Sequence, residues 1–486
     1  ADEVKRINPF DWDTEFADII KAGGFDAVIG NPPYIRIQTL KEWAPTEVEF
    51  YKKKFSSASK GNYDIYVVFV EQGLSLLNKN GLLGYILPHK FFNAQYGEPL
   101  RSVIAKGKHL KEIVHFGHQQ IFENATTYTC LLFLGKRGFD QLNFIKIDNL
   151  TDWRSSEKNM GGLLNSKNIT ETDWNFAVGD IGELMNRLKT QFPQFKLFNE
   201  KIAQGIRTSA NQIYILRNIS EENDLIKVYS DELKKEFQIE KKIAKNFLLG
   251  KEIKRFKINS PDNVVIFPYK LENQKVVLIE QEEMKLKYPL ALAYLSENKA
   301  FLQNREKGKW KNDQWYAFGR NQNLAEMNQS KILVPDIAAS SSFAFDENGG
   351  YAFTSGYGII LKDGTNYSPK YILGLLNSKL LDFYLKKIST VMRGGYIRFF
   401  SQYIEQLPIR TINFADPADK ARHDRMVTLV TQMLDLNKKV QDARLEQEKT
   451  LLSRQIEATD GAIDTLVYEL YGLTPEEIAI VEGAGK

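Results

Sequence analysis

The stretch FDAVIGNPPYIR, residues 25–36, decides the fold of the region around it. Residues 25–29 are mostly apolar and a glycine ends the run, so they are predicted to form a β-strand. The two consecutive prolines that follow fix φ and remove two backbone donors, so neither a ladder nor a helix continues through them. We therefore expect a rigid elbow at the end of a strand, which presents the Asn31 amide and the Tyr34 ring at fixed angles.

The elbow suits a flat, neutral amine as its ligand. The amide oxygen of Asn31 and the backbone carbonyl of Pro32 can both accept from an exocyclic NH2 group, and the Tyr34 ring can stack on the ring that carries the amine. Two acceptors at one nitrogen direct its lone pair outward, toward an electrophilic methyl group, by positioning and polarisation without a strong base. A purely structural turn also accounts for the same four residues.

Length and composition describe a globular protein of more than one domain. A chain of 486 residues is expected to form two or three domains, and its 43% hydrophobic and 26% charged content is ordinary. The net charge of +4 is too small to indicate a partner. The single cysteine, Cys130, excludes internal disulfides and lies in TYTCLLFL, which is predicted to be a buried strand. The five histidines form no metal-binding pattern, and without a membrane span or signal pattern the expected location is the cytoplasm.

Strands and helices alternate in the region up to about residue 180. The pattern predicts a helix over about residues 63–78 with Gly81 as its C-cap, and a second helix over about residues 97–106. Strands are predicted at LLGYILP, EIVHFG and TYTCLLFLGK, that is, at residues 82–88, 112–117 and 127–136. Strand–helix–strand spacing of this kind predicts a largely parallel sheet covered by helices.

Two later regions differ in composition. Residues from about 190 to 410 contain many aromatics, basic islands at residues 241–257 and 305–320, and short predicted strands at QIYIL, VVIFPY, KILVPDI and YGIILK. From Asp416 onward the chain is charged and helical, with an apolar seam of Leu429, Met433, Leu436, Val440, Leu452, Ile456 and Ile463. The seam suits a helical hairpin or short coiled coil, or two helices packed on the preceding domain. The oligomeric state therefore stays open, with a monomer favoured.

Three segments resemble the amino-methyltransferases that modify adenine N6 in DNA. FDAVIGNPPYIR is similar to their motif IV. Residues 62–92 are similar to the helix, strand and proline loop that follow this motif in the family. Residues 115–134 are similar to the motif whose aromatic residue stacks on the flipped-out adenine. The base must leave the duplex because N6 is not reachable within it. The resemblance implies S-adenosylmethionine as the cofactor and the following catalytic residues: Asn31, Pro32, Pro33, Tyr34 and Phe122, the last being the stacking residue opposite Tyr34. Phe122 also suits an ordinary core aromatic beside a strand.

The resemblance extends to the single-chain restriction–modification enzymes of type IIG. AQGIRTSANQIYIL, residues 203–216, is similar to the opening of their target-recognition domains. Later segments of the same domain resemble FLLGKEIKRF and KILVPDIA. The usual C-terminal helices of these enzymes resemble IDTLVYELYGLTPEEI. It implies the C-terminal half of a methyltransferase domain at residues 1–180, an α/β fold with a partial Rossmann-like sheet. An α+β target-recognition domain that binds double-stranded DNA follows at residues 181–412, and a C-terminal helical segment at residues 413–486.

The chain departs from these enzymes in two respects. They hold S-adenosylmethionine on a glycine-rich loop upstream of the elbow, and the residues before Asn31 are too few to form it. No acid-X-Lys triplet of a metal-dependent nuclease follows the Pro-Asp pairs at residues 261–262 and 335–336. We therefore expect a fragment that is inactive alone, the intact protein being a site-specific adenine methyltransferase. Two alternatives stay open: a nuclease-free methyltransferase from a phage-defence system, and a DNA-specificity module without catalysis.

Sequence-specific DNA binding needs phosphate contacts for position and base-edge contacts for choice. Glycine-containing loops of the second region carry basic and amide side chains that suit both tasks. The candidate DNA-binding residues are Arg207, Thr208, Asn211, Lys245, Lys251, Lys254, Arg255, Arg393 and Arg398. Any one of the basic residues also suits a solvated surface charge, so the clusters weigh more than the individuals.

Overall fold

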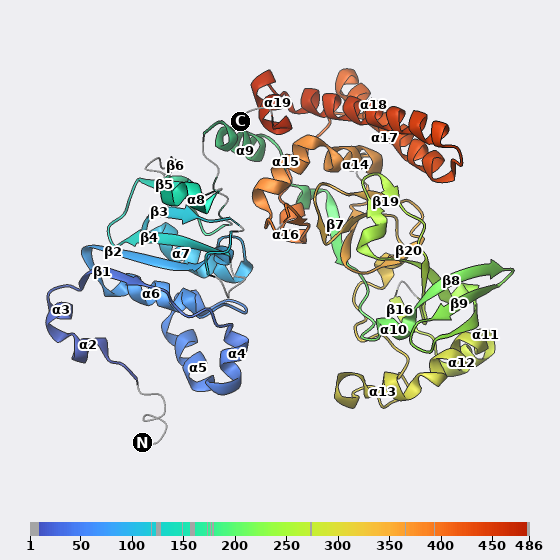
Figure 1. Ribbon diagram of the computed structural model, residues 1–486, viewed down its shortest axis with the longest axis horizontal. Coiled ribbons are helices and arrows are strands. Elements are labelled where there is room, and N and C mark those ends of the chain that lie inside the picture. Colours follow the sequence, from blue (N-terminus) through green and yellow to red (C-terminus); the bar gives the residue numbers. More distant parts are fainter. Residues whose placement is uncertain are drawn as a thin grey trace. The chain divides into compact units, whose positions relative to one another are not determined.

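The chain folds as two compact units, Ala1–Met185 and Asn186–Lys486 (Figure 1). A computed structural model describes residues 9–117, 119–122, 128–147, 149–155, 161–172, 174, 176, 179–272, 275–364, 366–392 and 394–483. The boundary between the units falls close to the domain boundary expected at residue 180. Contacts join the whole of Asn186–Lys486 into one unit, so the further division at residue 412 stays a prediction.

A six-stranded mixed sheet organises the first unit. Its strands are β1 (Phe25–Gly30), β2 (Leu77–Pro88), β3 (Leu110–His115), β4 (Thr129–Gly135), β5 (Gln141–Lys146) and β6 (Gly161–Asn165). They lie in the order β1-β2-β4-β3-β5-β6, in which β1 and β2 are parallel and β3 and β5 are parallel. The other three pairs are antiparallel, so the prediction of a largely parallel sheet is wrong. The connection from β3 to β4, residues 116–128, contains no helix among its described residues, and antiparallel neighbours need no crossover helix of the kind that joins parallel strands.

Helices cover one face of this sheet more fully than the other. The helices of the unit are α2 (Trp12–Glu15), α3 (Ala17–Lys21), α4 (Ile37–Trp43), α5 (Pro45–Lys54), α6 (Tyr66–Leu76), α7 (Glu98–Lys106) and α8 (Leu150–Ser155). Val70 of α6, Ile104 of α7 and Leu87 of β2 are fully buried in one core cluster. Around α8, Leu150 packs against a separate cluster from β3 and β5. Ile29 of β1 is 84% exposed, so the sheet is open at that strand.

The expected elements of the first unit are present, with a correction around α6 and β2. The helix ends at Leu76, and the NKNG segment, residues 78–81, lies inside β2 instead of capping the helix. The register between β1 and β2 shifts here, as at a β-bulge. Gly81 is required for close approach of the two strands, because a Cβ at this position would lie 2.5 Å from the carbonyl oxygen of Phe25.

Two larger sheets and three two-stranded pairs form the β-structure of the second unit. One sheet has the order β10-β9-β8-β14-β11-β20 and the other β19-β17-β21-β7. The bounds of these strands are β7 (Asn199–Gln204), β8 (Ile215–Glu222), β9 (Leu225–Ser230), β10 (Lys235–Glu240), β11 (Ala244–Leu248), β14 (Asn263–Ile266), β17 (Lys331–Pro335), β19 (Ala344–Asp346), β20 (Tyr351–Phe353) and β21 (Gly356–Leu361). The pairs are β12 (Ile253–Lys254) with β13 (Lys257–Ile258), β15 (Tyr269–Glu272) with β16 (Lys275–Leu278), and β18 (Ile337–Ala338) with β22 (Ile397–Arg398).

Three of the four short strands predicted here are confirmed, as β14, β17 and β21. The fourth, QIYIL, is wrong in its first half, where the helical turn α10 (Asn211–Tyr214) precedes β8. Ile213 and Tyr214 are both fully buried. Neighbouring residues of a strand point to opposite faces, whereas a helical turn lets both side chains reach one core. The further helices of this part are α9 (Gly179–Gln191), α11 (Gln281–Lys287), α12 (Pro289–Glu297) and α13 (Lys299–Gly308).

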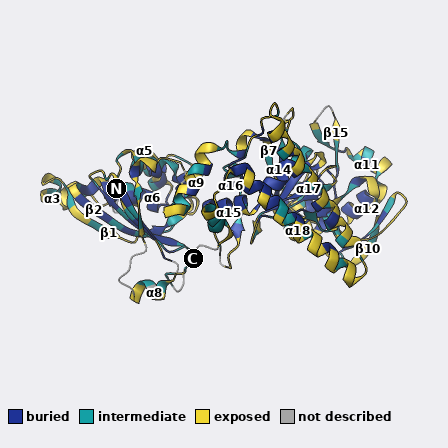
Figure 2. Cartoon of the chain, turned by 90° about the horizontal axis from the view of Figure 1, so that it is seen from above, coloured by how far each residue is buried: buried dark blue, intermediate teal, exposed yellow. Residues whose placement is uncertain are grey.

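The C-terminal part is helical, as predicted. Its helices are α14 (Pro369–Asn377), α15 (Lys379–Ile388), α16 (Ser401–Ile404), α17 (Pro417–Asp442), α18 (Glu446–Tyr471) and α19 (Pro475–Glu482). Helices α17 and α18 form a hairpin with buried residues on one face and exposed residues on the other (Figure 2). The hairpin packs on α14, where a Cβ at Gly374 would lie 2.5 Å from the sulfur of Met426. None of the helices in the described ranges is long and apolar enough to cross a membrane.

Candidate functional site

The NPPY elbow lies at the carboxyl end of β1 and is fixed by hydrogen bonds. The Tyr34 hydroxyl donates to Asn31 Oδ1 at 2.6 Å, and the carbonyl oxygen of Ile86 in β2 lies 3.1 Å from the same hydroxyl. Pro32 is buried, whereas Asn31 and Pro33 are exposed. The Asn31 amide is therefore open to solvent while its oxygen is held in one orientation by Tyr34.

The elbow and the loop that carries Phe122 lie at the same end of the sheet, where β1, β2 and β3 finish and β4 begins. Pro88 at the end of β2 pairs with Thr129 at the start of β4, and β3 ends beside the same part of β4. The loop between β3 and β4 therefore begins and ends at the edge where β1 leads into the elbow. Phe122 is half-buried in this loop, and residues 123–127 lie outside the described residues. The role of Phe122 in stacking on a base stays a prediction.

Three titratable side chains at this edge, Tyr34, His89 and His115, are neutral near pH 7. Burial raises the pKa of Tyr34 to about 12, so its hydroxyl keeps its proton and remains a donor. Burial lowers the pKa of His89 to about 4 and holds the pKa of His115 well below its usual value. The centroids of these two imidazole rings are 4.3 Å apart. Neutral hydrogen-bonding groups suit an uncharged amine better than they suit a charged ligand.

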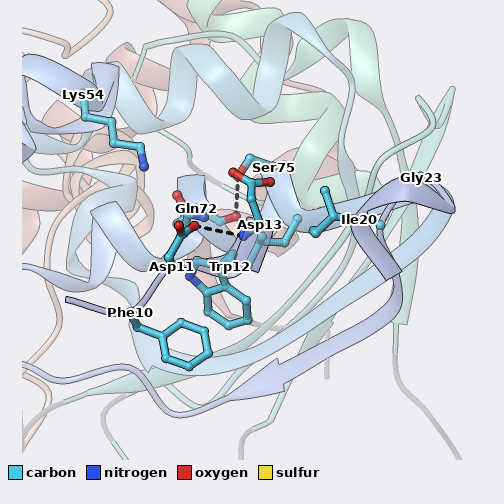
Figure 3. Close-up of a pocket in the computed structure, with 11 residues that line it drawn as sticks. Phe10, Asp11, Trp12, Asp13, Ile20, Gly23, Lys54, Gln72 and Ser75 are labelled. Atoms are coloured by element: carbon cyan, nitrogen blue, oxygen red, sulfur yellow. Dashed lines mark hydrogen bonds between the residues drawn. The ribbon is translucent and has the colours of Figure 1, made fainter. Parts of the chain in front are cut away.

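A separate hollow of about 340 Å³ lies at the opposite end of β1 (Figure 3). Gly24, which precedes β1, and Leu76, which precedes β2, are among the residues that line it. The side chains of Phe10 and Lys54 also line this hollow. It therefore lies at the amino ends of two parallel strands, whereas open α/β sheets bind their ligands at the carboxyl ends. The candidate site is the elbow and not this hollow.

Two of the predicted DNA-binding lysines in the second unit have exposed side chains. The side chain of Lys251 is 72% exposed, and its Nζ lies 3.6 Å from the carboxylate of the buried Glu252. Lys254 in β12 is also exposed. Lys251 lies within the turn Gly250–Glu252 and Lys254 follows it in β12, where their positive charges are accessible to a phosphate backbone.

The side chains of Arg255 and Lys245, two of the predicted DNA-binding residues, contact other residues of the protein. Arg255 Nη2 lies 2.7 Å from Asp460 Oδ1 of α18, an ion pair without the angles of a hydrogen bond. Lys245 is half-buried and donates to Asn328. Burial lowers the pKa of Lys245. Both side chains therefore have structural partners within the protein, and their contact with DNA stays a prediction.

The predicted recognition loop after β7 contains exposed and buried residues. Arg207 and Asn211 are exposed. Thr208 is 1% exposed, and its hydroxyl donates to Asn211 Oδ1 at 2.6 Å and accepts from Ala210 N at 2.9 Å. Thr208 therefore shapes the loop and is not positioned to touch a base, which corrects the expectation for this residue.

A cavity of about 290 Å³ connects Arg207 with the neighbours of Arg398. Arg398 Nη1 lies 3.1 Å from Asp336 Oδ2, and its guanidinium carbon lies 5.1 Å from the ring centroid of Phe400. Asp336, Phe400 and Arg207 all line the cavity. Arg393, the other candidate of this region, lies outside the described residues.

Two polar residues that adjoin Arg207 were not identified from the sequence. Gln204 Oε1 accepts from Arg207 Nη2 at 2.9 Å, and the backbone nitrogen of Arg320 donates to the carbonyl of Arg207 at 3.1 Å. The basic island at residues 305–320 includes Arg320, but the pairing of Arg320 with Arg207 is a tertiary contact that the sequence does not indicate. Nothing in the sequence distinguishes Gln204 from other surface glutamines.

Both units are similar to known protein families. Residues 1–122 match the Eco57I restriction-modification methylase family, and residues 245–409 match the TaqI-like C-terminal specificity domain. The chain is 30% identical over 507 residues to the type II restriction enzyme and methyltransferase RM.Eco57I of Escherichia coli, covering 99% of this chain and 49% of that protein. It therefore spans about half the length of that relative.

Further relatives agree with this match. The type II methyltransferase M.PaeR7I of Pseudomonas aeruginosa is 24% identical, with 96% of this chain and 73% of that protein covered. The structure of the type IIL restriction-modification enzyme MmeI in complex with DNA has a similar fold, with a TM-score of 0.59 at 14% identity over 98% of this chain and 58% of that one. An Eco57I-type methylase region followed by a TaqI-like specificity domain assigns the chain to the family of type II restriction–modification enzymes and methyltransferases.

Proposed function

We propose that the chain is the base-binding and sequence-reading portion of a type IIG restriction–modification enzyme that methylates N6 of a flipped-out adenine in double-stranded DNA. The observation that carries this proposal is the elbow, where the Tyr34 hydroxyl holds the amide oxygen of the exposed Asn31 at 2.6 Å. An acceptor fixed in this way meets the exocyclic amine of adenine without a cost for reorientation.

The elbow residues would act on the amine by hydrogen bonding alone. Asn31 Oδ1 and the Pro32 carbonyl accept the two N6 hydrogens, which turns the nitrogen lone pair away from the ring plane and outward. Tyr34 remains protonated, because burial raises its pKa to about 12, so it can orient Asn31 but cannot serve as a base. The proton that N6 loses would leave to water after methyl transfer, since the cationic methylated nitrogen is far more acidic than the neutral amine.

S-adenosylmethionine, the methyl donor of this family by resemblance, would need residues beyond those described in the first unit. These residues supply no glycine-rich loop between a strand and a helix that would hold it. Among the described residues, β1 has β2 as its one strand neighbour, and Ile29 on β1 is 84% exposed. The unpaired edge of β1 is where a further parallel strand would pair, and the uncovered apolar face at Ile29 is where a further helix would pack.

The second unit would select the DNA sequence. Lys251 and Lys254 have accessible charges that suit phosphate contacts. Arg207 lines a cavity that suits base edges, and Arg398 contacts two residues that line it, Asp336 and Phe400. Asn211 is exposed beside Arg207 and suits an adenine edge. Arg393 remains a candidate of the same kind.

Replacing Asn31 tests the proposed chemistry. In the full-length enzyme, Asn31→Ala should abolish methyl transfer to adenine while DNA affinity is retained, because only an acceptor at the reacting amine is lost. Asn80→Ala is the matched control, since Asn80 is an exposed asparagine near the other end of β2 and should leave both properties unchanged. The proposal is wrong if Asn31→Ala methylates at the rate of the wild type, or if it loses DNA affinity in parallel.

A methyltransferase without a nuclease is a second candidate. The match to M.PaeR7I favours it, because 73% of that protein, a type II methyltransferase by name, is covered by this chain. Incubating the full-length protein with unmethylated DNA and Mg²⁺ would separate the two: specific cleavage supports the type IIG enzyme, and methylation without cleavage supports the second candidate.

A further inference from the structure

Two arginines that are distant in the sequence lie directly opposite one another in the second unit. Arg207 and Arg320 form an antiparallel bridge, in which Arg320 N donates to Arg207 O at 3.1 Å and Gly319 N donates to Thr208 O at 2.9 Å. Residues directly opposite in an antiparallel pair have their side chains on the same face. Like charges in such a pair are destabilising, so an arrangement that retains both suits an anionic or acceptor-rich ligand.

A buried arginine braces the two segments that carry this pair. Arg305 is 7% exposed, and its guanidinium donates to the carbonyl oxygens of Thr208 and Ala317, each at 2.8 Å. These carbonyls belong to the two paired segments. The charge of Arg305 is thus satisfied internally, and it holds the backbones of Arg207 and Arg320 in a fixed spacing.

The two guanidinium groups are accessible and only partly neutralised. Arg207 Nη2 donates to the neutral Gln204 Oε1 at 2.9 Å. Arg320 Nη1 lies 2.9 Å from Glu306 Oε1, and the Arg320 side chain is 54% exposed. Glu306 Oε1 also accepts from Ser209 Oγ at 3.2 Å, so the carboxylate bridges the two segments. Lys309 Nζ lies 3.7 Å from the other oxygen of Glu306, and Asp336, which lines the cavity with Gln204 and Arg207, pairs with Arg398. Two carboxylates therefore accompany four cations here, which leaves a net positive charge beside the cavity.

We propose that Arg207 and Arg320 act as one pair that binds adjacent hydrogen-bond acceptors of a DNA duplex, with Gln204 and Glu306 as positioning residues. The inference rests on the proposed DNA-reading function and adds Arg320 to it. Two planar guanidinium groups match either the O6 and N7 acceptors of guanine in the major groove or neighbouring phosphate oxygens. Guanine and phosphate both offer hydrogen-bond acceptors to the arginines, but only contact with guanine makes binding depend on the DNA sequence.

DNA selection with the 486-residue chain tests the pair. Binding constants and selected sequences from a randomised duplex library are compared for wild type, Arg320→Ala and Arg320→Lys over a range of salt concentrations. The control is Arg217→Ala, because Arg217 is an equally exposed arginine (53%) with its own acidic partner, Asp231, in the same unit.

Contact with guanine predicts that Arg320→Ala lowers affinity by about 5- to 150-fold for the selected site and relaxes preference at one position. Arg320→Lys would then restore the salt dependence but not the preference. Contact with phosphate predicts an equal loss on all sequences, a salt slope reduced by about 1, and rescue by lysine. The double variant Arg207→Ala/Arg320→Ala should lose less than the product of the single losses, because the two act as one pair.

Glu306→Gln separates a positioning role from a merely structural one. Removing the carboxylate frees the Arg320 charge, so binding to random DNA should strengthen and the salt slope should rise by up to about 1. The inference is overturned if the wild type binds DNA selectively and the Arg320 variants behave like Arg217→Ala. A wild-type chain without any affinity for DNA overturns the proposed DNA-reading function instead, and the inference with it.

Discussion

The ring of Phe122 lies in a loop that begins and ends beside the elbow, half-buried and with its backbone carbonyl accepting from the Gln120 side chain at 3.0 Å. If the ring stacks on an extruded adenine, Phe122→Ala in the full-length enzyme should weaken capture of the base by about 1–3 kcal/mol. A fluorescent adenine analogue at the target position should then show less flipping. Phe50→Ala is the control, since Phe50 is 52% exposed on α5 of the same unit.

The same variant distinguishes the two roles that suit Phe122. A core aromatic would reduce thermal stability on truncation, typically by 3 kcal/mol or more when fully buried. Unchanged flipping together with a lower melting temperature would therefore assign Phe122 to the core and leave the base without its second stacking partner.

At the scale of single residues, the sequence indicates the elbow better than the DNA interface. NPPY is a local signal, because the prolines fix the backbone through their own rings and Asn31 reaches its partner only three residues away. The roles of Arg255 and Thr208 depend on tertiary contacts instead. Arg255 meets Asp460 across some two hundred residues, and the burial of Thr208 follows from the packing of its whole loop. Composition does not reveal either contact.

Lys251 lies in the tight turn between β11 and β12, and Lys254 lies in β12 directly after it. If both lysines touch phosphate, Lys251→Ala and Lys254→Ala should each weaken binding to all DNA sequences alike and reduce the salt slope by about 1. Binding isotherms of the 486-residue chain at several salt concentrations measure this slope. Lys285→Ala is the control, because Lys285 is exposed on α11 with an acidic neighbour. Slopes equal to that of the control would remove this turn from the interface.

Strands β2 and β3 end in a pair of buried imidazoles that makes the first unit sensitive to acid. Burial holds the pKa of His89 at about 4 and that of His115 well below 6.5, whereas both take up protons near pH 6.5 in the unfolded chain. The unfolded state therefore binds more protons below pH 6.5. The stability contributed by the neutral pair is complete above pH 6.5 and is lost as the pH falls through about 4.

Urea denaturation of the chain between pH 7 and pH 4 measures this effect. The midpoint should fall over that range, and it should fall less in His89→Phe, which keeps an aromatic ring among Phe92 and Tyr128 but cannot be protonated. Equal acid sensitivity of both proteins would mean that other groups govern the transition.

The positions of most elements could be predicted from the sequence, but their pairing could not. β14, β17 and β21 are apolar runs bounded by polar or proline-containing turns, and such runs are local signals. The order of the first sheet depends on β4 inserting between β2 and β3, which no periodicity encodes. Gly81 was assigned to a helix end because glycine is common there, whereas its place in β2 is required by the nearness of Phe25.

At the scale of the whole molecule, the first unit presents the proposed amine-binding elbow after a strand with one unpaired edge among the described residues. β1 has one strand neighbour among the described residues, and the apolar Ile29 is almost fully exposed at its end. Exposed strand edges are normally paired or covered. RM.Eco57I is about twice the length of this chain.

The 486-residue chain should therefore bind S-adenosylmethionine weakly or not at all, because the loop that would hold it is proposed to lie on the strand beside β1. Isothermal titration of the chain should give no heat that fits a micromolar site, whereas a longer protein that includes the preceding region should give one. Hydrogen exchange at Phe25–Gly30 provides a second measurement: the amides on the open edge of β1 should exchange more slowly in the longer protein, since a neighbouring strand would pair with them. A micromolar site on the chain alone would mean that the described residues hold the cofactor in another way, and that β1 is a true edge of the fold.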